Sequence, residues 1–362
     1  MSYIMYTPQV EVPQKDEDAQ SAKVIEIMRR ATAKNFDNHR HAIRGAHAKI
    51  HGCVVGTLEV HADLPAHLAQ GVFATPRKYP VILRLSSAPG DIRDDSIPVP
   101  HGMAIKIIGV PGPKLWPEGS DAVTQDFVMV SLPTIPFGDV SKYLKAQGLI
   151  DKQTASPDRV QHLTADFAHR TNEVLSHFGI QNSAIEGLGV SNDHILGQTF
   201  HTMAAVRYGD YIAKLSVAPS SPSVKTLIGQ RIDTHGNPSK LRDLVEAFFR
   251  EQGAEYEMRA QLCSDLTAMP VEDASVLWDE ASSPHQVIAT VSIPPQEAYS
   301  PARRVYSDDV LSFSPWHAIE EHRPLGSIMR IRKQAYESSS KFRHEMNVQQ
   351  RVEPRDISEV PD

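Results

Sequence analysis

Short runs of β-branched and apolar residues, broken by proline, glycine and aspartate, constrain the fold of this 362-residue chain most. Such runs predict β-strands, because branched side chains suit a pleated surface and the breakers suit turns. Four runs follow one another closely, at residues 49–62, 79–88, 101–110 and 125–132. Four more come later, at residues 197–208, 210–219, 254–264 and 284–294. About eight short strands in two groups favour an antiparallel barrel over a sheet of βαβ units.

Helical patterns flank these strands. Residues 327–347 contain no proline or glycine and follow a Pro-Leu-Gly turn, so we expect one long helix there. Residues 21–36 predict an amphipathic helix with Ser21 as its N-cap. The apolar residues at helical spacing in that segment are Val24, Ile27, Met28 and Ala31. Further helical patterns cover residues 140–150, 156–180 and 239–252.

Together these patterns predict an α+β fold in which helices flank an antiparallel barrel. We divide the chain into an N-terminal arm and helix over 1–36, one main domain over 37–347 and a polar tail over 348–362. Residues 1–20 are rich in proline, acidic and amide groups, so we expect an extended arm there.

Composition excludes several classes of function. A net charge of −7 provides no basic field for a phosphate backbone, so we expect no nucleic-acid partner. The chain has no long apolar run and no signal-like N-terminus, so we expect a cytoplasmic protein without a membrane span. Cys53 and Cys263 form no CxxC pair, which argues against a zinc ribbon or a thioredoxin-type site. Without a G-x-G-x-x-G fingerprint, we expect no nicotinamide cofactor.

Three residues of the predicted C-terminal helix form a candidate site. Arg332, Tyr336 and Arg343 fall within ~40° of one another at about 100° per residue, so they share one face. Guanidinium groups beside a phenol favour its ionised form, and a phenolate is a recognised axial ligand of haem iron. A solvated basic face carrying one tyrosine is the alternative interpretation.

The segment RGAHAK contains a second candidate, His47, which we expect at the start of a strand. An imidazole has a pKa near neutrality and can move a proton between two atoms of a substrate. Ser86 becomes its hydrogen-bond partner only if the second strand pairs with the first. One alternative is an ordinary barrel histidine. Another, which we rank lowest, is a metal cluster of His39, His41, His47 and His51, because their spacing matches no zinc pattern.

Six segments, taken in chain order, resemble motifs of the haem catalase superfamily and together span about residues 40–345. They are RGAHAK at 44–49, RLSS at 84–87, PHGMAIK at 100–106, FVMV with IPF at 127–137, MPVEDASVLW at 269–278, and FSPW with RKQAYESSSKFR at 313–343. The first is similar to the distal R-x-x-H-A-K of the family. The last has the R-x-x-x-Y-x-x-x-x-x-x-R spacing of its proximal helix.

The resemblance implies an eight-stranded barrel with haem b between the barrel and the C-terminal helix. It implies that Tyr336 is the axial tyrosinate of the iron, that His47 is the distal acid and base, and that Ser86 supports His47. The residues that would hold the haem are Arg44, Arg84, Phe127, Phe137, Arg332 and Arg343. It further implies reduction of hydrogen peroxide or organic hydroperoxides by an organic electron donor, through a ferryl intermediate, in defence against oxidative stress, with a homodimer as the possible assembly.

Departures from the family pattern favour one kind of member. The distal asparagine is missing, because residues 121–127 offer only Thr124, Gln125 or Asp126 in its place. The sequence also has no counterpart of the long end segments of larger members. We therefore expect similarity to the small catalase-related peroxidases, with true catalase activity as the alternative. Ala46 counts against an allene oxide synthase, which carries threonine directly before the histidine. A haem-binding module without turnover and a haem-free barrel stay open.

Overall fold

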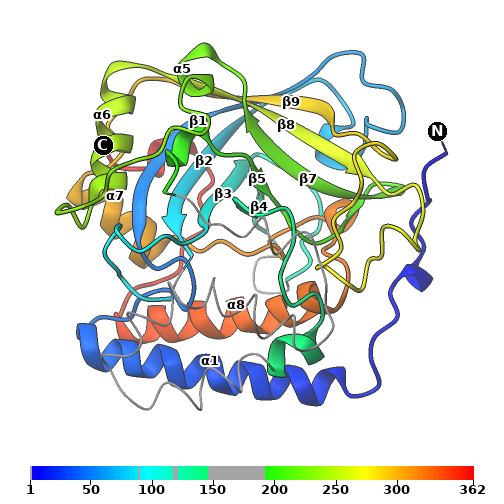
Figure 1. The fold of residues 1–362 in the computed structure, drawn as a ribbon, viewed down its shortest axis with the longest axis horizontal. Coiled ribbons are helices and arrows are strands. Elements are labelled where there is room, and N and C mark those ends of the chain that lie inside the picture. The colour runs from blue at the N-terminus through cyan, green and yellow to red at the C-terminus, as the bar shows by residue number, and fades with distance from the viewer. Residues whose placement is uncertain (1, 89, 117–120, 146–191) are drawn as a thin grey trace.

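The computed structural model of the chain describes residues 2–88, 90–116, 121–145 and 192–362. Within them, nine antiparallel strands form one sheet that curls round on itself (Figure 1). The strands are β1 Ile50–Val60, β2 Lys78–Ser87, β3 His101–Ile108, β4 Thr124–Val130, β5 Phe200–His201, β6 Val206–Tyr208, β7 Tyr211–Pro219, β8 Ala254–Leu262 and β9 Gln286–Ile293.

The order of the strands closes the sheet into a barrel. Neighbours run β5-β4-β3-β2-β1-β9-β8-β7-β6, and β5 also pairs with β7. This last pairing closes a ring of eight strands and leaves β6 as an added strand on β7. The predicted α+β fold, an eight-stranded antiparallel barrel with flanking helices, is confirmed.

One predicted strand is divided in the structure. The segment 197–208 forms two short strands, β5 and β6, instead of one. Between them Met203 has a φ of +62°, which a continuous strand does not allow. The hydroxyl of Thr202 in the same turn accepts a bond from the backbone N–H of Leu215 at 3.1 Å. The turn therefore attaches to β7 by a side chain, and the strand pairing stops there.

The barrel interior is a packed apolar core. In β7 every second residue belongs to it, namely Ala213, Leu215 and Val217, as the alternation of side chains along a strand requires. The buried phenols of Tyr208 and Tyr256 donate to the backbone oxygens of Leu68 at 2.6 Å and Leu196 at 2.9 Å. A buried hydroxyl needs such a partner, so both rings fit inside an apolar core.

The flanking helices are α1 Glu17–His39, α5 Pro222–Lys225, α6 Lys240–Glu251, α7 Pro301–Val305 and α8 Ser327–Met346. A π-helical turn, η5 Tyr306–Val310, follows α7. Short 3-10 turns occur at η1 Pro8–Val10, η2 Gly71–Phe73, η4 Ile195–Gly197, η6 Glu320–His322 and η7 Ile357–Glu359. Residues 140–145 are helical as predicted, whereas the predicted helix 156–180 lies outside the described residues. No helix in the described ranges has the length and apolar character needed to cross a membrane.

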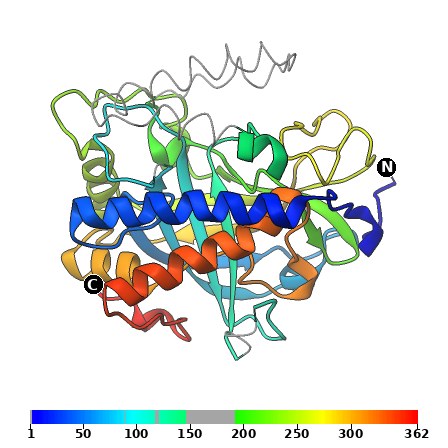
Figure 2. The ribbon, with the colours of Figure 1, turned by 90° about the horizontal axis from the view of Figure 1, so that it is seen from below.

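Helices α1 and α8 lie side by side beneath the barrel (Figures 1 and 2). Val24 and Ile25 of α1 pack with Ile331 of α8. The rings of Phe36 and Phe342 meet edge to face at 6.2 Å. α8 begins after Gly326, whose φ is +87° and whose missing Cβ would lie 2.2 Å from the backbone oxygen of Val271. Only glycine fits there, so the turn before α8 is fixed by this residue.

The start and the buried face of α1 differ from the prediction. α1 begins at Glu17, with Asp16 at the N-cap position, and Ser21 lies buried inside the helix. Arg330 of α8 explains the longer helix, because its guanidinium binds Glu17 at 2.5 Å and so fixes the first turn. Ala31, expected on the apolar face, is exposed, whereas Thr32 is buried. Contact with α8 thus rotates the buried face away from the one that the apolar residues indicate.

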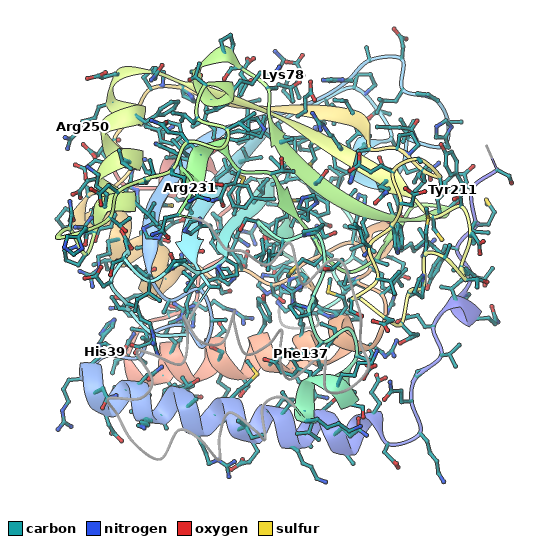
Figure 3. All side chains as sticks on the ribbon, in the orientation of Figure 1. His39, Lys78, Phe137, Tyr211, Arg231 and Arg250 are labelled. Carbon is teal, nitrogen blue, oxygen red and sulfur yellow. The ribbon has the colours of Figure 1, made fainter. Side chains whose placement is uncertain are left out.

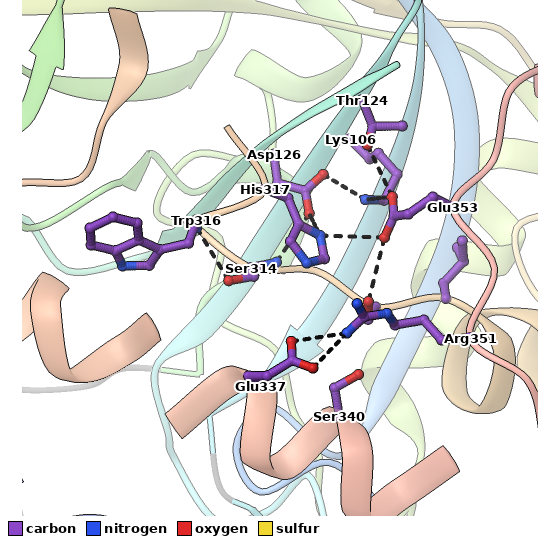
Figure 4. A network of polar contacts seen from close by, with 12 residues as sticks. Lys106, Thr124, Asp126, Ser314, Trp316, His317, Glu337, Ser340, Arg351 and Glu353 are labelled. Carbon is purple, nitrogen blue, oxygen red and sulfur yellow. Dashed lines mark hydrogen bonds and ion pairs between the residues drawn. The ribbon is translucent and has the colours of Figure 1, made fainter. Parts of the chain in front are cut away.

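The C-terminal tail packs against the barrel through one glutamate. Glu353 lies within 2.7 Å of the buried Lys106 ammonium and 3.3 Å of His317 Nδ1. Lys106 also binds Asp126 at 2.7 Å, and Asp126 lies 3.2 Å from the same His317 nitrogen (Figure 4). We call Lys106, Asp126, His317 and Glu353 the tail network. It attaches residues that follow α8 to strands β3 and β4.

Candidate active site

A cavity lies between the barrel and α8, and it brings together residues far apart in the sequence. It holds about 730 Å³ of empty space, counting the part open to solvent. Six of the nine predicted site residues line it, namely Arg44, His47, Arg84, Ser86, Tyr336 and Arg343. They come from the loop before β1, from β2 and from one face of α8. The structure therefore places both halves of the predicted site at one cavity.

His47 lies in a loop, three residues before β1 begins at Ile50, and not at a strand start as expected. Its φ is +53°, a left-handed conformation that few residues with a side chain adopt. Its backbone N–H donates to Ala88 O at 2.9 Å, which helps to hold this unusual backbone. Such strain is typical of residues whose side chain must point to a particular place.

The predicted partner of His47 is present. Strands β1 and β2 pair antiparallel with Ile50 opposite Ser86, and the Ser86 hydroxyl lies 3.2 Å from His47 Nδ1. Gly102 in the neighbouring β3 makes room for the ring, because a Cβ there would lie 2.5 Å from Nδ1. The imidazole is therefore oriented by one hydroxyl above a strand position that lacks a side chain.

The surroundings of His47 keep its ring neutral. Burial, with smaller contributions from the positive charges of Arg84 and Arg332 and from His101, lowers the pKa of His47 to about 3. A neutral imidazole can accept a proton at physiological pH. Because Ser86 occupies Nδ1, the other ring nitrogen, Nε2, is the one available to a substrate.

Tyr336 lies on the opposite wall, on α8. Arg332, one helical turn earlier, donates from Nη2 to the Tyr336 phenol oxygen at 2.6 Å. Its guanidinium carbon also lies 5.0 Å from the centre of the Tyr336 ring. The predicted pair is thus formed, although Arg332 does not line the cavity in the described part of the chain. Ala335, Ser339 and Ser340 share the cavity face and leave space around the phenol because their side chains are small.

Three arginines, which we call the arginine cluster, meet at one end of the cavity: Arg44, Arg84 and Arg343. Arg343 donates to the backbone oxygens of Asp308 and Leu311, and Arg44 donates to those of Ser307 and Leu311. Arg84 donates to the backbone oxygen of His47 at 2.9 Å and lies 3.0 Å from the Asp308 carboxylate. Asp308 was not predicted, because the π-helical turn η5 that presents it lacks a strong sequence signal.

The cluster has more positive charge than its neighbours neutralise. Burial and the nearby Arg343 and Arg84 lower the pKa of Arg44. Burial is also the main reason why the pKa of Arg343 falls to about 10. The Nε atoms of Arg44 and Arg84 are buried and have no hydrogen-bond partner within the described part of the chain. A buried donor is costly when unpaired, so this end of the cavity suits an anionic group with several oxygens.

Two predicted site residues lie elsewhere. Phe127 faces the barrel core, where its ring packs near Phe73 at 6.2 Å and His322 at 5.5 Å. Phe137 lies 6.5 Å from the ring of Tyr143, in the segment before residues 140–145. Neither is among the described residues that line the cavity. The structure therefore does not bring these two rings to the arginines and the tyrosine.

The three candidates for the missing asparagine also lie away from His47. Asp126 belongs to the tail network, where it binds Lys106 (Figure 4). Thr124 donates to Glu353 at 3.0 Å, and Gln125 accepts from the backbone N–H of Ile319 at 3.0 Å. The part of β4 that lines the cavity is apolar, and consists of Val128 and Met129. Sequence reasoning missed these two residues, because β4 is buried on both faces.

The four clustered histidines have four different partners. His39 binds Asp91 at 2.7 Å near the end of α1, and His41 binds Asp309 at 2.8 Å (Figure 3). His51, in β1, lies 2.7 Å from the Ser87 hydroxyl, whereas His47 meets Ser86. The structure does not gather them as a ligand set, and no group of His, Cys, Asp or Glu in the described ranges is arranged to hold a metal ion.

The barrel and the helices that flank it define the fold of the catalases. In particular, the chain is similar to a fungal catalase with a TM-score of 0.61 at 14% identity, over 91% of this chain and 68% of that one. For catalase A from Saccharomyces cerevisiae the TM-score is 0.57 at 14% identity, over 96% and 70% of the two chains. For a bacterial catalase it is 0.59 at 14% identity, over 97% and 66%. The chain thus spans about two thirds of their length. No family model and no curated protein matches the sequence.

Proposed function

We propose that this protein binds haem b in the cavity between the barrel and α8 and reduces peroxides there with an organic electron donor. One observation carries the proposal. Tyr336, the neutral His47 and the arginine cluster with unpaired donors all line this cavity, and Arg332 donates a hydrogen bond to Tyr336 from outside it. The catalase fold supports the same interpretation, and the identities of 14% leave the activity to be tested.

The side chains present fit haem at both ends of the group. The phenol of Tyr336 would hold the iron, since tyrosine is a known axial ligand, and Arg332 would stabilise it as phenolate. Arg44, Arg84 and Arg343 would hold the two propionates, which supply the anionic oxygens that the cluster lacks. Gly102, Ala104 and Ala335 would leave room for a flat ring system. When bound, haem supplies the iron at which a peroxide O–O bond is cleaved.

His47 would move the proton that cleavage requires. Its neutral imidazole accepts a proton from the peroxide oxygen that approaches the cofactor, and returns it to the outer oxygen, which leaves as water or alcohol. Ser86 holds Nδ1, so the transfer runs through Nε2 of the same ring. The low pKa of His47 keeps the accepting form in place across the physiological range.

Within this function, we favour a peroxidase similar to the small catalase-related peroxidases over a true catalase. No asparagine or other amide lines the cavity among the described residues, where β4 presents Val128 and Met129. Two successive hydrogen peroxide molecules would then be positioned less strictly, while a bulkier donor can compete for the second step. Catalase activity is the alternative. A module that binds haem without turnover is a third, from another class.

Titration of the purified protein with haem tests the cofactor. We expect a Soret band with one equivalent bound and the spectrum of a tyrosinate complex. Tyr336→Phe should lose that spectrum, whereas the control Tyr211→Phe, at the edge of the barrel beside the N-terminal segment and outside the cavity lining (Figure 3), should keep it. A protein that binds no haem, or a Tyr336→Phe variant with the wild-type spectrum, would contradict the proposal.

Two activity measurements then rank the alternatives. Oxygen evolution from hydrogen peroxide is compared with oxidation of a phenolic donor in the same haem-loaded sample. We expect donor oxidation to be the faster reaction. Oxygen evolution that exceeds it would establish the catalase alternative, and a haem complex without either activity would establish the binding module.

A further inference from the structure

A second cavity lies on the other side of Arg44. It is formed by residues 41–44, by Ala48 and Ile92, and by the segment from Pro301 to Asp309. It holds about 790 Å³ of empty space, counting the part open to solvent. Arg44 lines both cavities, so this cavity adjoins the candidate active site at that side chain.

The charges in this second cavity favour an anion. Its two carboxylates already have partners, since Asp308 lies 3.0 Å from Arg84 and Asp309 binds His41 at 2.8 Å. Its guanidinium groups are not neutralised by these carboxylates. The guanidinium of the exposed Arg304 makes no hydrogen bond or ion pair with another described residue. Arg44, whose unpaired Nε is available to a haem propionate on the other side, adds its positive charge to this cavity. A carboxylate that enters would meet Arg304 at the mouth and Arg44 inside.

The walls of this cavity favour an apolar body on the same ligand. Ile92 is 44% exposed and Val305 is 49% exposed, and both are large apolar side chains that would be covered by a ligand. Pro301 and Ile43 complete the wall. Apolar surface beside unpaired cations is the usual makeup of a site for a small amphipathic acid.

We infer that the second cavity binds the electron donor, and that the donor is a small phenolic carboxylic acid. This inference rests on the proposed function, since it names the class of its second substrate. Per turnover, two donor molecules each give up one electron and one proton from the phenol O–H. The peroxide takes up both and becomes water plus water, or alcohol plus water. Two phenoxyl radicals leave.

Binding is tested first, without turnover, by calorimetry of the purified protein with 4-methoxycinnamate, which has the carboxylate but no phenol O–H. Arg304→Gln should weaken this binding by about fivefold to tenfold, the usual net effect of one hydrogen bond that stays in contact with solvent. Ile92→Glu should weaken it as well, because it places a negative charge on the apolar wall. Arg250→Gln on α6 (Figure 3), whose guanidinium binds Glu246 and Glu297 and does not line the second cavity, is the matched control and should bind as the wild type does.

Kinetics then connect the site to the reaction. With 4-hydroxycinnamate as donor, Arg304→Gln should raise KM about fivefold to tenfold and leave kcat within about twofold. With the neutral methyl ester as donor, the KM values of Arg304→Gln and wild type should agree. Equal binding of acid and ester by the wild type would overturn the carboxylate assignment. Binding that Arg304→Gln abolishes without any change in KM would overturn the donor role.

The two proposals fail in different ways. The protein could bind 4-methoxycinnamate through Arg304 without binding haem. The proposed function and the donor assignment would then both be wrong, but the anion site would be established. If haem binds and phenols are oxidised, but 4-methoxycinnamate does not bind, the proposed function holds and the further inference is wrong.

Discussion

The protein buries two clusters of charged side chains in one barrel, and they differ in how their charges are balanced. In the tail network, Lys106 lies between the carboxylates of Asp126 and Glu353, and His317 lies beside the same two carboxylates. In the arginine cluster, three guanidinium groups are near two carboxylates, of which Asp308 binds Arg84 and Asp309 binds His41. Two Nε atoms of this cluster have no hydrogen-bond partner among the described residues. The charges of the tail network balance, although His317 Nδ1 lacks a well-aligned hydrogen bond among the described residues. An unbalanced cluster indicates a ligand that completes it.

The pKa values of the two clusters shift in opposite ways. Burial alone would lower the pKa of Lys106, but Asp126 and Glu353 outweigh it and raise the pKa. Burial would raise the pKa of Asp126, but Lys106 and His317 outweigh it and lower the pKa. Lys106 and Asp126 thus stabilise the charged form of each other. In the arginine cluster the opposite holds, because burial and like charges lower the pKa of Arg44 and Arg343.

The largest expected effect separates the histidines of the two regions. His47→Ala should keep haem and unfold as the wild type does, and it should lose peroxide cleavage by ~10²–10⁴-fold, the usual contribution of a general acid and base. His317→Ala should keep peroxide cleavage and lose unfolding free energy. The reason is that this ring stacks on Trp116 with centres 3.9 Å apart and borders two carboxylates. Stopped-flow kinetics and chemical denaturation of both variants check this. Unchanged turnover in His47→Ala would remove His47 from the mechanism.

Removal of one carboxylate from the tail network should cost about 3–5 kcal/mol of unfolding free energy, because Asp126→Ala leaves the Lys106 ammonium buried and only half neutralised. The double variant Lys106→Met with Asp126→Leu should recover much of that loss. Urea denaturation of the haem-free protein measures both. If Asp126→Ala is as stable as the wild type, the tail network is not the balanced structural cluster that the contacts indicate.

How much of this site the sequence predicts depends on how far apart in the sequence the contacting residues lie. Arg332, Tyr336 and Arg343 were predictable, because helical periodicity alone puts them on one face. The pair of His47 and Ser86 was predictable once neighbouring strands are taken to pair. Phe127 could not be assigned to a face, since β4 is buried on both sides and its alternation of polar and apolar residues is lost.

Contacts between segments far apart in the sequence could not be predicted. Asp308 meets Arg84 across 224 positions, and Glu353 meets Lys106 across 247. Neither separation produces a periodic pattern of residues in the sequence from which the contact could be predicted. For the same reason the sequence predicts only a polar tail, although Glu353 binds the buried Lys106 of β3 and Val360 is buried.

An arginine of the cluster should behave differently from Asp126. In the haem-free protein, Arg44→Met loses two bonds to backbone oxygens but also relieves repulsion from Arg84 and Arg343, so we expect stability within about 1 kcal/mol of the wild type. Haem affinity should fall by about 10- to 100-fold, equivalent to one or two charge-assisted bonds. Denaturation without haem and haem titration measure the two effects separately. A large loss of stability without haem would mean that the cluster is structural.

The dependence of stability on pH should differ between the regions. For Asp126, whose folded pKa is lowered, the stabilisation is present above its unfolded pKa of ~3.9 and is lost as pH falls further. For Lys106, whose folded pKa is raised, it is present below ~10.4 and is lost as pH rises further. The contribution of Asp126 and Lys106 is therefore constant from about pH 5 to pH 9. Denaturation of wild type and Lys106→Met at pH 5, 7 and 9 should give equal differences.

His47 should make stability fall in acid over a different range. Its pKa is about 3 in the folded protein, so between pH ~6.5 and ~3 only the unfolded chain binds this proton. The unfolding free energy then drops by at most ~1.4 kcal/mol per pH unit from this group. His47→Gln should remove that part of the slope. The same slope in both proteins would mean that His47 is protonated in the fold.

The smallest expected effect tests whether the tail also positions α8. Arg351 binds Glu337 through two contacts of 3.2 and 3.0 Å, and Glu337 directly follows Tyr336 (Figure 4). This pair is partly exposed, so Glu337→Gln should cost only about 0.2–1 kcal/mol of unfolding free energy. The exposed pair of Lys341 and Glu345, at 3.7 Å on the same helix, is the matched control, and Glu345→Gln should cost less. If the tail positions the helix, Glu337→Gln also shifts the haem spectrum and Glu345→Gln does not. Identical spectra in both variants would mean that the tail contributes to stability and does not orient Tyr336. Arg332 would then be the residue that orients it.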